Sequence, residues 1–177
     1  MKGVIFNIVE EVVVDHFGQT TWEALLEATG LSGAYTSLGS YPDAEVVALV
    51  EAAAALTNQD PRAVLHWVGV QALPKLHQRY PEFFDAADDA RTFILSLNTI
   101  IHPEVRKLYA GAICPHFHFI ETPGTLTLGY GSPRKMCDLA HGFVDGLAIH
   151  YGERLAVTQP SCMHDGAPSC QLVVSWL

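Results

Sequence analysis

Apolar residues in the first half of the chain recur at intervals of three and four, which is the spacing of helices that bury one face. The first such run contains Ile5, Val9, Val12 and Val13 and ends at Gly18. Further helical runs are predicted at residues 21–30, 43–56, 61–76 and 89–101, with a short helical turn at 81–84 and a loop at 33–42. The first half is therefore expected to be helical.

Several polar residues and prolines set the expected helix boundaries. Thr21 is predicted to cap the second helix, and Asp60 with Pro61 has the pattern of a cap followed by a first-turn proline. Pro74 is expected to kink or end the helix that contains it. Because a residue before proline is biased away from helical geometry, Pro103 predicts a bend at His102 that moves its imidazole out of the helical row.

The second half has a different periodicity. Residues 116–121 and 126–130 alternate, and Thr122-Pro123-Gly124 between them indicates a hairpin. Residues 135–151 have helical spacing, and 155–159 with 170–176 are predicted as two closing strands. The expected class is α+β, with a helical half followed by a small antiparallel sheet on which a helix packs.

Composition narrows the classes of function. The 177 residues suit one domain, and the 49% apolar content leaves room to enclose an apolar ligand. A net charge of −9 argues against nucleic acid and against anionic membrane surfaces as partners. No apolar run is long enough to span a membrane and no secretory signal is evident, so we expect a cytoplasmic protein.

The middle of the chain contains two motifs that suit a cofactor. His102 lies among apolar residues, and Tyr130, Ser132 and Arg134 form a Y-x-S-x-R pattern. A histidine on an apolar helix is more often a core residue than a ligand, and an arginine at a strand end is commonly just exposed. However, a guanidinium has donors that match paired anionic oxygens, and the two hydroxyls supply more. Together the motifs indicate a metal at one end of a cofactor and carboxylates at the other.

These motifs, together with Met1–Ile5, Ala112–Pro115 and Cys162–Ala167, resemble the haem nitric oxide/oxygen binding (H-NOX) family along the whole chain. The resemblance implies an H-NOX-like fold around a buried haem b, with His102 as the proximal iron ligand. It also implies that Tyr130, Ser132 and Arg134 hold the haem propionates. The whole of 1–177 would form one domain, with a distal helical part at about 1–60 and a haem-ligating proximal part at about 61–177.

The resemblance also bears on which gas binds. In O2-binding members a tyrosine follows the serine of the motif by seven residues, and here that position is Leu139. Val9 and Ala72 correspond to supporting positions, and none of the three offers a donor. This implies binding of NO and CO with poor binding of O2, although all three also suit an ordinary core. Ile5 and Pro115 resemble the residues that press on the porphyrin and distort it.

The resemblance implies a bacterial sensor rather than an enzyme. NO would weaken the bond between iron and His102, release the helix that carries it, and shift the two halves relative to each other. The signal would go to a separate protein, either a histidine kinase or a cyclic-di-GMP enzyme. An enzyme that uses Cys114 with His116, or Cys162 with His164, has no evident orienting acid.

Three cysteines form a second group of interest. Cys137, Cys162 and Cys170, with His164 between the last two, have the residue types of a tetrahedral zinc site. Some relatives have a histidine where this chain has Gln159, so zinc binding through His164, a weak site and plain buried thiols all remain open. A thiol or zinc redox sensor based on these cysteines is the alternative function.

Overall fold

The helical first half is confirmed, and it ends in an irregular segment around His102. The computed structural model describes all residues 1–177. The helices are α1 (Gly3–Phe17), α2 (Gln19–Thr29), α3 (Asp43–Thr57), α4 (Pro61–Arg79), α5 (Pro81–Asp85), α6 (Ala90–Ser96) and α7 (His102–Leu108), with a π-helical turn η1 (Leu97–Ile101) between α6 and α7. Asp60 caps α4 as predicted, because its side chain accepts the Arg62 N–H at 2.8 Å.

One local prediction was wrong, and a second was wrong in one of its two alternatives. Thr21 lies inside α2 rather than before it, and its hydroxyl donates to the Phe17 carbonyl at 2.9 Å instead of capping. Gly18, with a φ of 86°, lets the chain turn early enough for α2 to begin at Gln19. Of the two outcomes predicted for Pro74, ending the helix is wrong, since α4 continues to Arg79. Packing on both sides of α4 outweighs the hydrogen bond that this proline lacks.

The second half contains the predicted sheet and helix. The strands are β1 (His116–Thr122), β2 (Thr125–Gly131), β3 (Leu155–Ser161) and β4 (Cys170–Trp176), with α8 (Cys137–Tyr151) between β2 and β3. A short 3-10 turn, η2 (Met163–Asp165), precedes β4. The order is β1-β2-β4-β3 with every pair antiparallel, so β1 and β3 are edge strands. The class is α+β, as expected.

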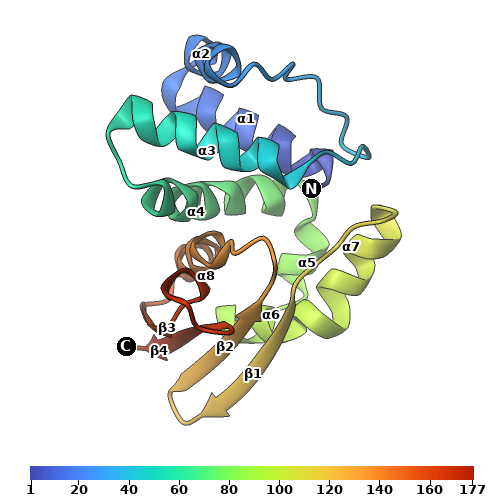
Figure 1. Cartoon of the computed structure of the whole chain (residues 1–177). Coiled ribbons are helices and arrows are strands. Elements are labelled where there is room, and N and C mark those ends of the chain that lie inside the picture. The colour runs from blue at the N-terminus through green and yellow to red at the C-terminus, as the bar shows by residue number, and fades with distance from the viewer.

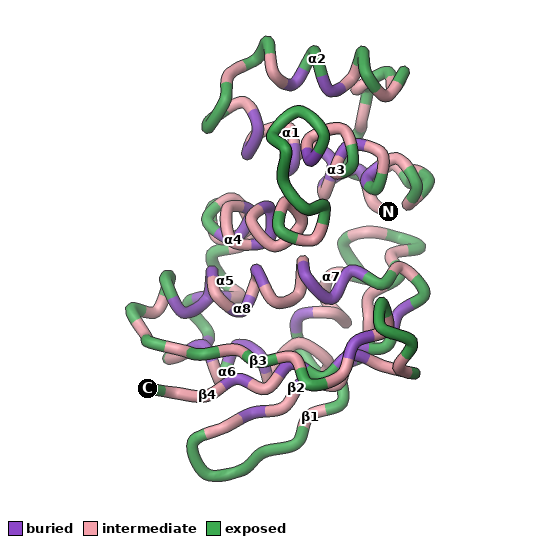
Figure 2. Tube along the Cα trace, turned by 60° about the vertical axis from the view of Figure 1, so that its left-hand side comes forward, coloured by how far each residue is buried: buried purple, intermediate pink, exposed green.

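The elements stack in layers around α4. In Figure 1 helices α1–α3 lie on one side of α4, and α8 with the sheet lies on the other. Figure 2 shows buried positions on helices of both layers and on the central strands, while the tip of the β1–β2 hairpin is exposed. No helix combines the length and the apolar character that crossing a bilayer requires.

The two larger of three apolar cores correspond to these layers, and the smallest joins α1 to α4. The larger one is formed by α5, α6, α8 and the sheet and includes Phe84, Ile94, Leu128 and Leu172. The other is formed by α1, α2, α3 and the start of α4, and Trp22 is buried in it. Helix α4 contributes to both cores, so it connects the helical layer to the layer that contains the sheet.

Candidate haem site

His102 begins α7 at a π-helical turn. The expectation that it leaves helical geometry was wrong, because its φ of −65° and ψ of −36° are helical. Its N–H reaches the Leu97 carbonyl five residues back, which is the π-type hydrogen bond. Pro103 has no N–H, and its ring would meet the carbonyl four residues before it in an ordinary helix. The wider turn upstream accommodates the proline, and the helix continues with His102 facing inward.

The imidazole of His102 has a buried nitrogen without a partner. Nδ1 makes no hydrogen bond, and the ring lies 6.0 Å from that of Phe117. Burial lowers the pKa of His102 to about 4, with the positive charge of Arg106 acting in the same direction and the Pro115 backbone opposing it. The imidazole is therefore neutral near pH 7, which is the form that binds a metal.

Asn98 fixes the turn that precedes His102, although the apolar periodicity did not identify it. Its Nδ2 donates to the Phe117 carbonyl at 2.6 Å, and its Oδ1 accepts the Phe117 N–H at 3.1 Å. These bonds satisfy peptide groups on the free edge of β1, so they join the histidine-bearing turn to the sheet. An amide inside an apolar helical run, four residues before His102, was the available signal.

Tyr130, Ser132 and Arg134 lie at the junction between β2 and α8. Tyr130 is buried, and its hydroxyl accepts the Met136 N–H at 3.1 Å, which leaves its proton free to donate. Burial raises the pKa of Tyr130, so the phenol stays protonated. The Ser132 hydroxyl accepts the Arg134 N–H at 3.3 Å and retains its own proton as a donor. All three residues therefore offer donors to an anionic group.

Arg134 already has one carboxylate partner. Its Nε donates to Asp43 Oδ2 at 2.7 Å and its Nη1 to the Ile113 carbonyl at 2.6 Å, which leaves Nη2 for another acceptor. Asp43 also accepts the Met1 ammonium at 2.6 Å. Burial alone would raise the pKa of Asp43, but the two cations outweigh it and the pKa is lowered. The ion pairs of Asp43 with Arg134 and with the Met1 ammonium thus connect the two layers of the fold.

An apolar cavity of about 330 Å³ adjoins these layers. Of its 24 lining residues 21 are hydrophobic, and Ile5, Val9, Ala72 and Leu139 are among them. These four predicted residues therefore share one cavity, and none brings a side-chain hydrogen-bond donor to it. His102 does not line this cavity. Pro115 is near His102 instead, since its backbone affects the imidazole pKa.

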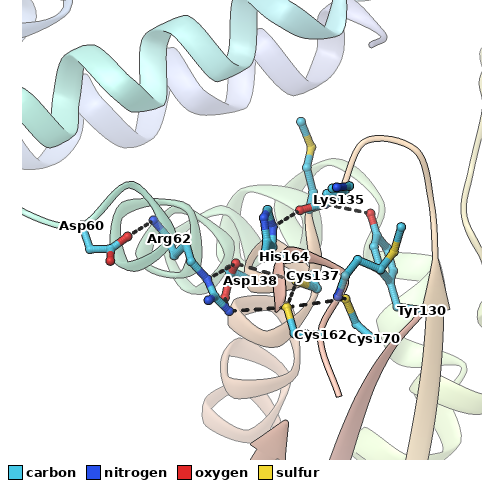
Figure 3. Close-up of polar contacts among 11 residues, drawn as sticks. Asp60, Arg62, Tyr130, Lys135, Cys137, Asp138, Cys162, His164 and Cys170 are labelled. Carbon is cyan, nitrogen blue, oxygen red and sulfur yellow. Dashed lines mark hydrogen bonds and ion pairs between the residues drawn. The ribbon is translucent and has the colours of Figure 1, made fainter. Parts of the chain in front are cut away.

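Three buried thiols converge on the other side of α8. Cys137 Sγ lies 3.8 Å from Cys162 Sγ, which lies 3.9 Å from Cys170 Sγ. Figure 3 shows Arg62 reaching this group, with Nη2 3.7 Å from Cys162 Sγ and its guanidinium paired with Asp138. Zinc–sulfur bonds of about 2.3 Å place thiolates roughly 3.8 Å apart, so the spacing of the sulfurs suits a zinc ion.

The fourth ligand that zinc requires is not among these thiols. His164 groups with Cys137 and Asp138 rather than with all three cysteines, and its Nε2 bonds the Lys135 carbonyl at 2.8 Å. Gln159 is at the position of the relatives' histidine, and its buried Nε2 has no partner. Burial raises the pKa of Cys137 well above the usual thiol value. The group is better described as packed thiols than as a complete zinc site.

The residues around His102 and at the β2–α8 junction fit a haem. A neutral buried imidazole suits iron, while Tyr130, Ser132 and Arg134 offer donors to carboxylates at the neighbouring junction. The cavity lined by Ile5, Val9, Ala72 and Leu139 is apolar, which suits a small uncharged gas. This fit rests on the unpartnered Nδ1 of His102 together with the Arg134 guanidinium and the hydroxyls of Tyr130 and Ser132.

Known proteins share both the sequence pattern and the fold. A Haem-NO-binding family profile matches residues 2–159. An H-NOX protein from Shewanella oneidensis in its Fe(II)NO state is 32% identical over 100% of this chain and 99% of that chain, with a TM-score of 0.95. The Fe(II)CO form from Shewanella oneidensis is 32% identical over 100% and 99% of the two chains, with a TM-score of 0.91.

A third relative is the unliganded Fe(II) H-NOX protein from K. algicida, which is 26% identical over 100% of this chain and 97% of that one, with a TM-score of 0.89. No curated protein that was compared with the chain matches it. The family profile covers most of the sequence, and the Shewanella structures superpose on the whole fold. The chain therefore belongs to the Haem-NO-binding, or H-NOX, family of haem-based gas sensors.

Proposed function

We propose that this protein binds haem b through His102 and senses NO and CO, without catalysing a reaction. The observation that carries the proposal is the buried, unpartnered Nδ1 of a neutral imidazole next to the Pro115 backbone. Haem supplies an iron atom that binds diatomic gases. Tyr130, Ser132 and Arg134 hold its propionates, because two buried carboxylates need paired charge and hydrogen bonds.

Discrimination against O2 rests on the cavity that Val9, Ala72 and Leu139 line. Bound O2 becomes partly negative and is stabilised by a hydrogen-bond donor, whereas NO needs none. The cavity offers no side-chain donor from these three residues. Ile5 lines the same cavity from α1, and Pro115 lies near His102. We assign to both of them the role of pressing on the porphyrin.

The signal follows from release of His102 when NO binds. Helix α7 and the π turn before it are then free to reposition, and Asn98 transmits the movement to β1. The proposed division into a distal part at about 1–60 and a proximal part at about 61–177 is supported by the larger core, whose buried residues all lie beyond residue 60. A ligand that prefers one arrangement of these parts shifts the population toward it.

The receiver of the signal is proposed to be a separate cytoplasmic protein in a bacterium, either a histidine kinase or a cyclic-di-GMP enzyme. The net charge of −9 favours a protein partner with a basic surface over nucleic acid or an anionic membrane. Direct binding assays with the kinase and with the cyclic-di-GMP enzyme, each run with and without NO, distinguish the two candidate partners. Only the receiver should bind this protein with an affinity that changes when NO is added.

An absorption spectrum tests the haem and gas assignments together. Purified protein, reduced without oxygen, should show a haem band that shifts with NO and with CO but not promptly in air. His102→Gly should lose haem unless imidazole is added, whereas His116→Gly, which removes an exposed histidine of β1, should keep it. Absence of a haem band after haem is supplied, or equal haem retention in both variants, would reject the assignment of His102.

A thiol or zinc redox sensor is not favoured as the main function. The family match concerns haem and NO, and the thiol group lacks the histidine that would complete a zinc site. Instead, the three cysteines pack against one another as small apolar residues in the larger core.

A further inference from the structure

Helices α4 and α8 approach each other unusually closely, and this contact brings together side chains outside the haem site. A Cβ added at Gly142 would lie 2.0 Å from the His66 carbonyl oxygen and 3.0 Å from the Gly69 Cα. The backbones therefore touch where glycine stands on both helices, and Figure 1 shows α8 next to α4. Side chains that flank this contact, such as His66 and His141, meet across it as a result.

His66, His141 and Asp145 form a group of metal-ligand atoms at this contact. The Nε2 of His66 lies 2.8 Å from Asp145 Oδ2, and the Nε2 of His141 lies 3.6 Å from the same oxygen. The two rings are 4.7 Å apart between centroids and nearly perpendicular. One ligand atom of each residue lies within 4.8 Å of the other two.

These distances suit a single first-row divalent ion. Imidazole nitrogens and carboxylate oxygens bind zinc at about 2.0–2.2 Å, which places two ligands of a tetrahedral ion roughly 3.3–3.5 Å apart. The observed separations of 2.8 and 3.6 Å fall on either side of that range. Small side-chain adjustments are enough, because all three side chains are 25–35% exposed and an ion can enter from solvent.

We infer that His66, His141 and Asp145 bind one zinc-class divalent cation and that water completes its coordination. Two imidazoles and one carboxylate, with an open position, are a ligand set used by zinc. The ion links α4 to α8, and both helices also contribute to the apolar cavity through Ala72 and Leu139. The inference does not depend on haem binding, and it involves none of the cysteines.

A second histidine pair on the same two helices provides a matched control. His77 of α4 and His150 of α8 have ring centroids 4.6 Å apart, so they resemble the first pair in spacing and location. Neither of these rings is paired with a carboxylate at ion-pair distance, whereas His66 and His141 share Asp145. If any pair of neighbouring surface histidines bound metal, both pairs would bind Zn²⁺. The proposed site predicts that only the pair that shares Asp145 does so.

Calorimetric titration of the haem-loaded protein with Zn²⁺ tests the inference. At Zn²⁺ concentrations that saturate the site, the wild-type protein should bind one more equivalent of Zn²⁺ than His141→Gln or Asp145→Asn. If the variants still bind that equivalent, their affinity for it should be at least about 10-fold lower than that of the wild type. His150→Gln should match the wild type. Equal stoichiometry and affinity in wild type, His141→Gln and Asp145→Asn would overturn the inference, whatever zinc the cysteines bind.

A measurement on the unaltered protein removes the risk that a variant misfolds. In the reduced protein under CO, Zn²⁺ should shift the Nε2 resonances of His66 and His141 in long-range ¹H–¹⁵N spectra. The resonances of His77 and His150 should stay in place. Shifts of the second pair alone, or no shift of the first pair at saturating zinc, would contradict the assignment.

Discussion

The Arg134 guanidinium donates from Nε to Asp43 Oδ2 at 2.7 Å and so connects the loop before α8 to the first turn of α3. The two residues are 91 positions apart in the chain. The same carboxylate holds the Met1 ammonium at the start of the helical layer. Asp43 therefore links the motif assigned to the haem propionates with the layer assigned to gas selectivity, and movement of one layer changes the charge environment of the other.

Asp43→Asn should weaken this link and destabilise the protein by about 1 kcal/mol, since solvent screening limits a pair whose carboxylate is 39% exposed. The pKa of Asp43 is lowered in the folded state. Its contribution is therefore complete above the unfolded pKa near 3.8 and is lost as pH falls through the lower folded value. Denaturant titrations of both proteins should differ by a constant amount at neutral pH and converge in acid.

A difference between the two proteins that stays constant down to pH 2 would contradict the ion-pair explanation. Glu45→Gln is the matched control in the same helical turn, because Glu45 accepts from the Tyr35 hydroxyl and does not contact Arg134. The effect of Glu45→Gln on the free energy of unfolding should not depend on whether haem is bound. This variant should also leave the haem absorption spectrum unchanged.

Leu139→Tyr should place a hydrogen-bond donor in the part of the cavity where Val9, Ala72 and Leu139 provide none. Leu139 lines the cavity of about 330 Å³ from α8, so a phenol at this position reaches the space where we propose that the gas binds. We expect a ferrous–O2 complex that persists in air, measured by its absorption spectrum and its rate of oxidation. Leu139→Phe supplies the same ring without the hydroxyl and should not form it. A stable O2 complex in both variants, or in the wild type, would refute the donor argument.

The sequence predicted helices and strands more accurately than it predicted contacts between distant side chains. Apolar periodicity located all the long helices and the four strands, because most of these elements bury apolar side chains at regular intervals. The π turn at Leu97–Ile101 was not predicted, because apolar periodicity does not distinguish a wider turn that accommodates Pro103 from an ordinary helical turn. Similarly, the pairing of Arg134 with Asp43 results from the assembled layers, which a single sequence does not describe.

Asn98→Ala tests whether the turn before His102 is fixed by side-chain hydrogen bonds. The substitution leaves the Phe117 N–H and carbonyl unpaired at the edge of β1, which should cost about 1–3 kcal/mol. It should also raise the fraction of protein in which NO releases His102, because the turn is no longer held to the sheet. Thermal unfolding measures the first effect, and the ratio of five- to six-coordinate NO spectra measures the second.

Thr99→Ala is the control for this prediction. Thr99 lies in the same π turn but is exposed and makes no side-chain hydrogen bond, so stability should change by less than about 0.5 kcal/mol. If Thr99→Ala and Asn98→Ala behave alike, the turn is stabilised by its apolar contacts and Asn98 has no positioning role.

Gly142→Ala should separate α4 from α8. Alanine normally stabilises a helix interior by about 0.5–1 kcal/mol over glycine. Here its Cβ would lie 2.0 Å from the His66 carbonyl oxygen, and a rigid backbone cannot yield at that distance. We expect the overpacking to exceed the helix gain and give net destabilisation of about 1–3 kcal/mol. Denaturant titration measures the loss, and Gly131→Ala, whose Cβ would meet no atom within 4 Å, should be nearly neutral.

The same substitution also connects packing to gas binding. Ala72 follows Gly69 by three residues on α4, and Leu139 precedes Gly142 by three on α8, so helix separation widens the cavity between them. The association rate for CO should rise in Gly142→Ala and stay unchanged in Gly131→Ala, as flash photolysis can measure. Unchanged stability together with an unchanged CO rate in Gly142→Ala would mean that the two helices tolerate a wider spacing, and that their close contact does not set the size of the cavity.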